Sequence, residues 1–127
     1  MIEKLVLVAM GGALGACLRF ASVSGMVRLT GESFWGTLFV NVVGSFVMGV
    51  LVVLFLERIT GETNRMAVFA LTGVLGGFTT FSAFSMDAMR LFEQGRGLTA
   101  LSYVGGSVLL SLFALLVGVL SARALAV

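Results

Sequence analysis

The sequence predicts an all-α integral membrane protein with four transmembrane helices, folded as a single membrane domain over residues 1–127. Composition is the first reason, because 59% of the residues are hydrophobic and only 11% are charged, whereas soluble domains carry about 25% charged residues. The second is that the apolar residues gather in four long stretches joined by short polar links. This number of charged residues is too small to cover the surface of a water-soluble fold. We therefore expect the helices to be surrounded by lipid.

Each apolar stretch is long enough to cross a membrane, which takes about 20 predominantly apolar residues in a helix. We expect the four helices at about residues 4–27, 34–56, 65–93 and 98–123. We also expect the third helix to be broken in mid-membrane, near residues 76–80. Since the chain has no proline, glycine must make such a break.

The residue types that are missing exclude several functions. There is no histidine and Cys17 is the only cysteine, which excludes a disulfide framework and argues against a zinc or haem site. Without histidine the serines have no imidazole base, and Lys4 is the only lysine, so we do not expect an enzyme. The basic residues are scattered singly, so we expect no nucleic-acid partner.

Basic residues are almost balanced across the membrane. With four spans, both termini and the middle link lie on one side. That side carries Lys4, Arg58, Arg65 and Arg123, and the other carries Arg28, Arg90 and Arg96, with Arg19 close to it. Orientation follows a bias in Lys and Arg, and a chain without one can insert both ways and pair as an antiparallel homodimer. A fixed orientation set by one or two charges is the alternative.

Two polar side chains in the first two spans are candidates for function, because such groups are costly in lipid. Arg19 lies toward the end of the first span, where it either snorkels to the interface or attracts anions at a vestibule. Asn41 lies within the second span, where its amide must find hydrogen-bonding partners. This amide either forms a hydrogen bond between two helices or donates into a pore.

The strongest signal is the run of glycines and hydroxyl residues at 72–85 (TGVLGGFTTFSAFS) in the third span. It permits an unwound turn, which is tolerated at membrane depth only where it is buried or lines a polar path. Backbone carbonyl groups freed by the turn can coordinate sodium. The alternative is a helix kinked at glycine, in which the Ser and Thr hydroxyls hydrogen-bond to the freed backbone groups. Phe81 and Phe84 share a face and can turn positive ring edges to an anion, although two core phenylalanines are the simpler interpretation.

The fourth span carries a stripe of hydroxyls, because Tyr103, Ser107 and Ser111 follow one another at steps of four and so share a helix face. These hydroxyls can donate to an anion, or they hydrogen-bond to another helix. The next step of four reaches Leu115, where the stripe becomes apolar.

Three motifs, in this order, resemble those of the Fluc (CrcB) fluoride channels: residues 11–20 (GGALGACLRF), 36–44 (GTLFVNVVG) and 73–85 (GVLGGFTTFSAFS). The resemblance covers essentially the whole chain. It implies a passive, highly selective channel that exports fluoride from the bacterial cytoplasm across the inner membrane. It also implies an antiparallel, dual-topology homodimer with a pair of pores and a central structural sodium ion.

The resemblance also implies roles for single residues, by match of motif. The fluoride pore would be lined by Asn41, Phe81, Phe84, Tyr103, Ser107 and Ser111. The carbonyl groups of Gly76 and Thr79 from both subunits would hold the sodium ion, and Arg19 would be the first-helix arginine at the vestibule. Asp87 stands where relatives carry a glutamate.

Two other classes of function compete with an anion channel. A proton-coupled small-molecule exporter of dual topology would need a membrane-embedded carboxylate in the first helix, where this chain has Cys17 and Arg19. A membrane scaffold would leave the third-span run and the hydroxyl stripe without a purpose. The residues by themselves indicate a small anion, and the resemblance supplies fluoride.

Overall fold

A computed structural model describes residues 1–58 and 65–125. Within them it contains four helices long and apolar enough to cross a membrane, which confirms that prediction. These spans are Ile2–Thr30, Ser33–Glu57, Arg65–Glu93 and Gly97–Ala124. The first span runs a few residues past both predicted ends. It ends at Gly31, which has a φ of 79° and whose N–H donates to the Val27 carbonyl at 2.8 Å.

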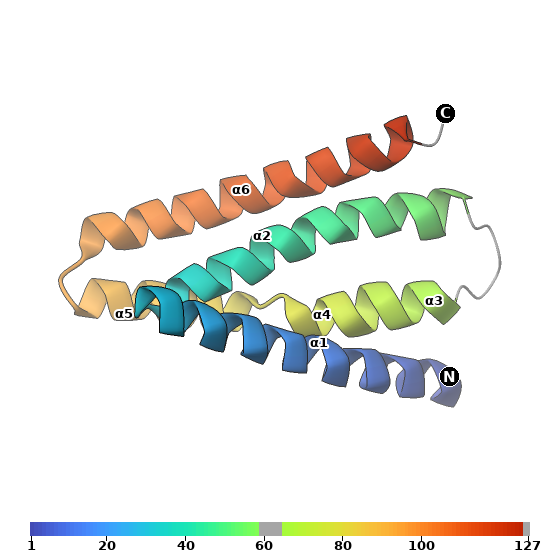
Figure 1. Cartoon of the computed structure of the whole chain (residues 1–127), viewed down its shortest axis with the longest axis horizontal. Helices are drawn as coiled ribbons and strands as arrows, with labels where there is room; N and C mark the ends of the chain where they lie inside the picture. The colour runs from blue at the N-terminus through green and yellow to red at the C-terminus, as the bar shows by residue number, and fades with distance from the viewer. Residues whose placement is uncertain (59–64, 126–127) are drawn as a thin grey trace.

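The helices form a bundle in which both chain ends lie at the same end (Figure 1). The successive elements are α1 (Ile2–Thr30), α2 (Ser33–Val52), η1 (Val53–Arg58), α3 (Arg65–Ala67), η2 (Val68–Leu75), α4 (Gly76–Phe78), α5 (Phe81–Glu93) and α6 (Gly97–Ala124). The two η elements are wide π-helical turns that continue α2 and α3. Two contacts dominate the packing: α1 packs against η2 and α4 of the third span, and α2 packs against α6. In each contact the helices run in the same direction (Figure 1).

Glycine permits the close approach of α1 to the third span. A Cβ atom added to Gly11 would lie 2.9 Å from the Cα atom of Gly73, and one added to Gly77 would lie 2.5 Å from the carbonyl oxygen of Gly12. Small residues at such positions let helix backbones touch, which is how helices associate in lipid without a hydrophobic driving force. These glycines therefore serve packing within one chain.

A second glycine contact joins α2 to α6. A Cβ atom added to Gly49 would meet the backbone of Leu115 and Val119, and one added to Gly118 would meet the backbone of Phe46 and Val50. The contact fixes how far α2 and α6 are shifted along each other.

Ion pairs tie the helix ends together at both faces of the bundle. Arg96 donates to Glu32 at 2.7 Å between the α5–α6 and α1–α2 links, and its guanidinium lies 5.8 Å from the ring centroid of Phe34. At the opposite end, Arg123 donates to Glu57 at 3.1 Å, and Arg65 pairs with Glu3. These ion pairs thus lie at the two ends of the spans, where water and headgroups are available.

One cluster of packed, buried side chains is small and largely aromatic. It is formed by Phe34, Phe84, Leu91, Ala100 and Tyr103. Most large apolar side chains, such as Phe20, Leu109 and Phe113, instead point outward. A soluble protein of this size could not expose so much apolar surface, whereas lipid accepts it.

Candidate functional site

The site begins at an extended stretch between α4 and α5. Thr79 has φ −85° and ψ 157°, and Thr80 has φ −154° and ψ 122°. The helix resumes at Phe81 because the Thr80 hydroxyl accepts a hydrogen bond from the Ala83 N–H at 3.2 Å, which makes Thr80 the N-cap of α5.

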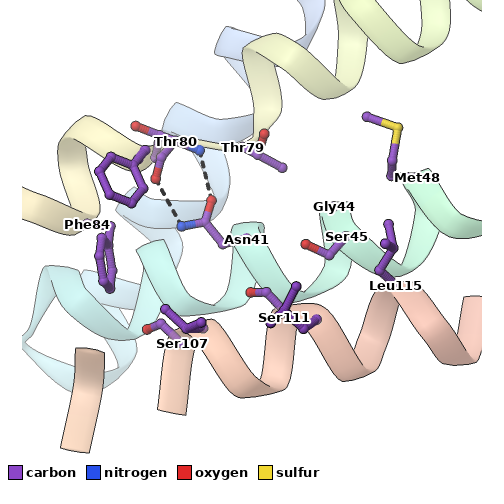
Figure 2. A pocket seen from close by; sticks show the side chains of 13 residues that line it. Asn41, Gly44, Ser45, Met48, Thr79, Thr80, Phe84, Ser107, Ser111 and Leu115 are labelled. Carbon is purple, nitrogen blue, oxygen red and sulfur yellow. Dashed lines mark hydrogen bonds between the residues drawn. The ribbon is translucent and has the colours of Figure 1, made fainter. Parts of the chain in front are cut away.

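Asn41 on α2 binds this extended stretch from the side (Figure 2). Its amide nitrogen donates to the Thr80 carbonyl at 2.9 Å, and its amide oxygen accepts from the Thr80 N–H at 2.8 Å. The side chain thus pairs with the backbone as a neighbouring strand would. A carboxamide has two N–H donors, and this pairing uses only one, so the second is left for another acceptor.

A pocket of about 370 Å³ lies beside Asn41, between α2, α6 and the Thr79–Thr80 stretch (Figure 2). Its polar lining consists of Asn41, Ser45, Thr79, Thr80, Ser107 and Ser111. Its apolar lining includes Met48, Phe81, Phe84, Val108, Leu112 and Leu115. Neutral donors and aromatic rings therefore face this space, with no charged side chain among the residues that line it.

Ser107 is a buried side chain of this pocket that lacks a hydrogen-bond partner. It is only 5% exposed, and within the described part of the chain its buried hydroxyl oxygen has no partner. Buried polar groups are nearly always paired, so an exception calls for a ligand or water. The hydroxyl can donate to an acceptor in the pocket.

Comparison with known proteins identifies the family. A family model described as "CrcB-like protein, Camphor Resistance (CrcB)" matches residues 6–119. The chain belongs to the CrcB family. A protein of Cereibacter sphaeroides named fluoride-specific ion channel FluC is 53% identical over 124 residues, which is 97% of this chain and 97% of that protein. Proteins with the same name from Rhizobium meliloti and Mesorhizobium japonicum are 47% and 43% identical over 98% and 96% of this chain.

The two phenylalanines of this CrcB chain differ in their surroundings. Phe84 is 8% exposed and packs on Tyr103, whereas Phe81, which also lines the pocket, is 77% exposed. Their ring centroids are 5.3 Å apart, and the rings are tilted by 42°. The rings thus form one wall that runs from the core to the surface of the chain.

Tyr103 does not line the pocket, although it shares the helix stripe with Ser107. It is buried in the aromatic core, and its hydroxyl lies 3.4 Å from a carboxylate oxygen of Asp87. Asp87 also accepts from Ser33 at 2.8 Å and from Thr37 at 2.6 Å. Sequence reasoning missed Ser33 and Thr37 as partners, although an acid in an apolar span signals that donors must surround it.

The remaining predicted residues fall into separate places. Ser111 and Leu115 line the pocket. Arg19 is half-buried on α1 and is not among the lining residues. Within the described part of the chain, no hydrogen bond ends on the carbonyl oxygens of Gly76 or Thr79, so both are free to coordinate another group.

Proposed function

We propose that this chain is a passive fluoride channel and that fluoride passes through the pocket beside Asn41. The buried, unpartnered hydroxyl of Ser107 carries the small-anion part of the proposal. The relatives named fluoride-specific ion channel, at 53% identity over nearly the full length, supply the identity of the anion. An ion channel of this class is not an enzyme.

The lining suits a small, strongly hydrated anion. Fluoride must exchange its water shell for donors, and Ser107, Ser111 and the second N–H of Asn41 can provide them. Conduction requires sites that bind well enough to admit the ion yet weakly enough to release it. Neutral donors satisfy that requirement better than an arginine at the same place, and the positive edges of Phe81 and Phe84 add a weak attraction.

We further propose that the working unit is an antiparallel homodimer with a pore on each side. Phe81 lines the pocket and is 77% exposed in one chain, and a second copy packed against it would close the pocket wall. Added Cβ atoms on Gly105 and Gly106 would meet nothing within 4 Å, so these glycines are available for close contact with a second copy. The near balance of basic residues across the membrane suits insertion in both orientations.

A structural sodium ion at the dimer axis is part of the same proposal. The extended Thr79–Thr80 stretch would lie in mid-membrane as the break in the third helix, where free backbone carbonyls must find a partner. The unpaired carbonyls of Gly76 and Thr79 provide the hard oxygen ligands that sodium takes. Exchanging sodium for N-methylglucamine during purification should then reduce fluoride flux and weaken the dimer, and unchanged flux would argue against the sodium site.

A proton-coupled exporter fits these residues less well. Such an exporter needs a carboxylate that exchanges protons in the transport pathway, but the buried Asp87 lies outside the pocket lining and is held by three hydroxyl groups. We place the protein in the bacterial inner membrane, where a channel of this kind would let fluoride leave the cytoplasm.

Ion efflux from liposomes tests the proposal. Vesicles that hold the purified protein are loaded with potassium fluoride or potassium chloride, and valinomycin balances the charge. Rapid fluoride release with no chloride release is the expected result. Equal release of both ions would indicate a generic anion pore, and no release from folded dimers would exclude a channel.

A further inference from the structure

The hydroxyl stripe of α6 ends before the pocket does. Ser107 and Ser111 line the pocket, and one turn later the same stripe reaches Leu115, which also lines it. An anion that leaves Ser111 along this stripe would meet an apolar side chain and lose its donors. Loss of hydration without replacement is costly for a charge in an apolar environment.

The contact between α2 and α6 shows which residue lies level with this gap. Gly49 on α2 meets the turn of α6 that begins at Leu115 and ends at Val119. The two helices run in the same direction (Figure 1). One turn before Gly49, Ser45 is therefore level with the preceding turn of α6, from Ser111 to Leu115.

The Ser45 hydroxyl also points into the pocket and is free to donate a hydrogen bond to an ion there. It lines the pocket, one turn after Asn41 on the same face of α2. Figure 2 shows its hydroxyl directed into the pocket, between Ser111 and Leu115 along the helices. Within the described residues the Ser45 hydroxyl makes no hydrogen bond, not even to the carbonyl one turn back that helical serines often use.

We propose that Ser45 is a further ligand of the permeating anion, supplying from α2 the hydroxyl that α6 lacks at Leu115. The polar path would then cross from Ser107 and Ser111 on α6 to Ser45 on α2. This inference rests on the proposed anion channel and adds a residue that neither the three motifs nor the α6 stripe had assigned to the path.

The test compares fluoride efflux for the wild type, Ser45→Ala and the control Ser24→Ala. Ser24 is a serine within α1, outside the pocket lining. Removing one donor should slow efflux about tenfold in Ser45→Ala, in keeping with the value of one hydrogen bond to a charge. Ser24→Ala should keep the wild-type rate, and size-exclusion profiles should show all three proteins as the same species.

A second variant separates a lost donor from a packing effect. Leu115→Ser in the Ser45→Ala background restores a hydroxyl at the same level from the other helix, so it should recover most of the lost rate. Equal rates for wild type and Ser45→Ala, or no recovery in the double variant, would overturn the role of Ser45. A wild type that releases no fluoride would instead overturn the channel proposal itself.

Discussion

Replacing Asn41 by aspartate perturbs both the backbone and the charge of the proposed path. The Asn41 amide donates to the Thr80 carbonyl at 2.9 Å and accepts from the Thr80 N–H at 2.8 Å. Aspartate keeps the acceptor but turns a second carboxylate oxygen toward the Thr80 carbonyl. One hydrogen bond is lost, and leaving that buried carbonyl unsatisfied costs about 1–3 kcal/mol.

The new charge also repels the permeating ion. For about 5 Å between the carboxylate and fluoride, and an effective dielectric constant of about 20, the repulsion is about 3 kcal/mol. Since about 1.4 kcal/mol corresponds to a factor of ten, fluoride flux through Asn41→Asp should fall on the order of a hundredfold.

Fluoride efflux from liposomes measures this effect, with Asn41→Ala as the matched control. The alanine variant removes both hydrogen bonds to Thr80 but adds no charge, so it should lose flux by a smaller factor than the aspartate variant. Both proteins must remain folded as judged by size-exclusion chromatography. Flux in Asn41→Asp within threefold of the wild type would refute the placement of the anion beside Asn41.

Three further predictions concern the pocket wall, the helix contacts and the buried acid. Phe81→Ile removes the ring edges from the pocket wall, so fluoride efflux should fall about tenfold; an unchanged rate would contradict the aromatic role. Gly118→Ala forces α2 and α6 apart and should lower the free energy of unfolding by about 1–3 kcal/mol, whereas Gly25→Ala, with nothing within 4 Å, should not. Asp87→Asn leaves Ser33 or Thr37 without its acceptor and should cost about 1–3 kcal/mol of stability, and thermal melts equal to the wild type would contradict this.

The four spans were predictable because a spanning helix in lipid is recognised from its own length and composition. Stretches such as Ser33–Glu57 and Gly97–Ala124 need no knowledge of their neighbours. The family was recognisable for a related reason, since its motifs lie in continuous segments, and the family model confirms that recognition over residues 6–119.

The partners of the polar residues were not predictable, because they lie far away in the sequence. Asn41 pairs with Thr80, 39 residues on, and Asp87 accepts from Ser33, 54 residues back. Helix periodicity placed Tyr103 on one stripe with Ser107, but it could not tell that the aromatic core would draw Tyr103 away from the pocket. The pore roles of these residues remain predictions.

Ser107→Ala tests the central claim, that the pocket beside Asn41 is the fluoride path. Ser102→Ala is the control, because Ser102 is an exposed serine on the same helix, outside the pocket lining. Since the Ser107 hydroxyl has no partner within the described chain, its loss should leave thermal stability unchanged or raise it. Fluoride efflux should nevertheless fall about tenfold, the value of one donor to a charge. Wild-type efflux in Ser107→Ala, or equal losses in both variants, would contradict the account.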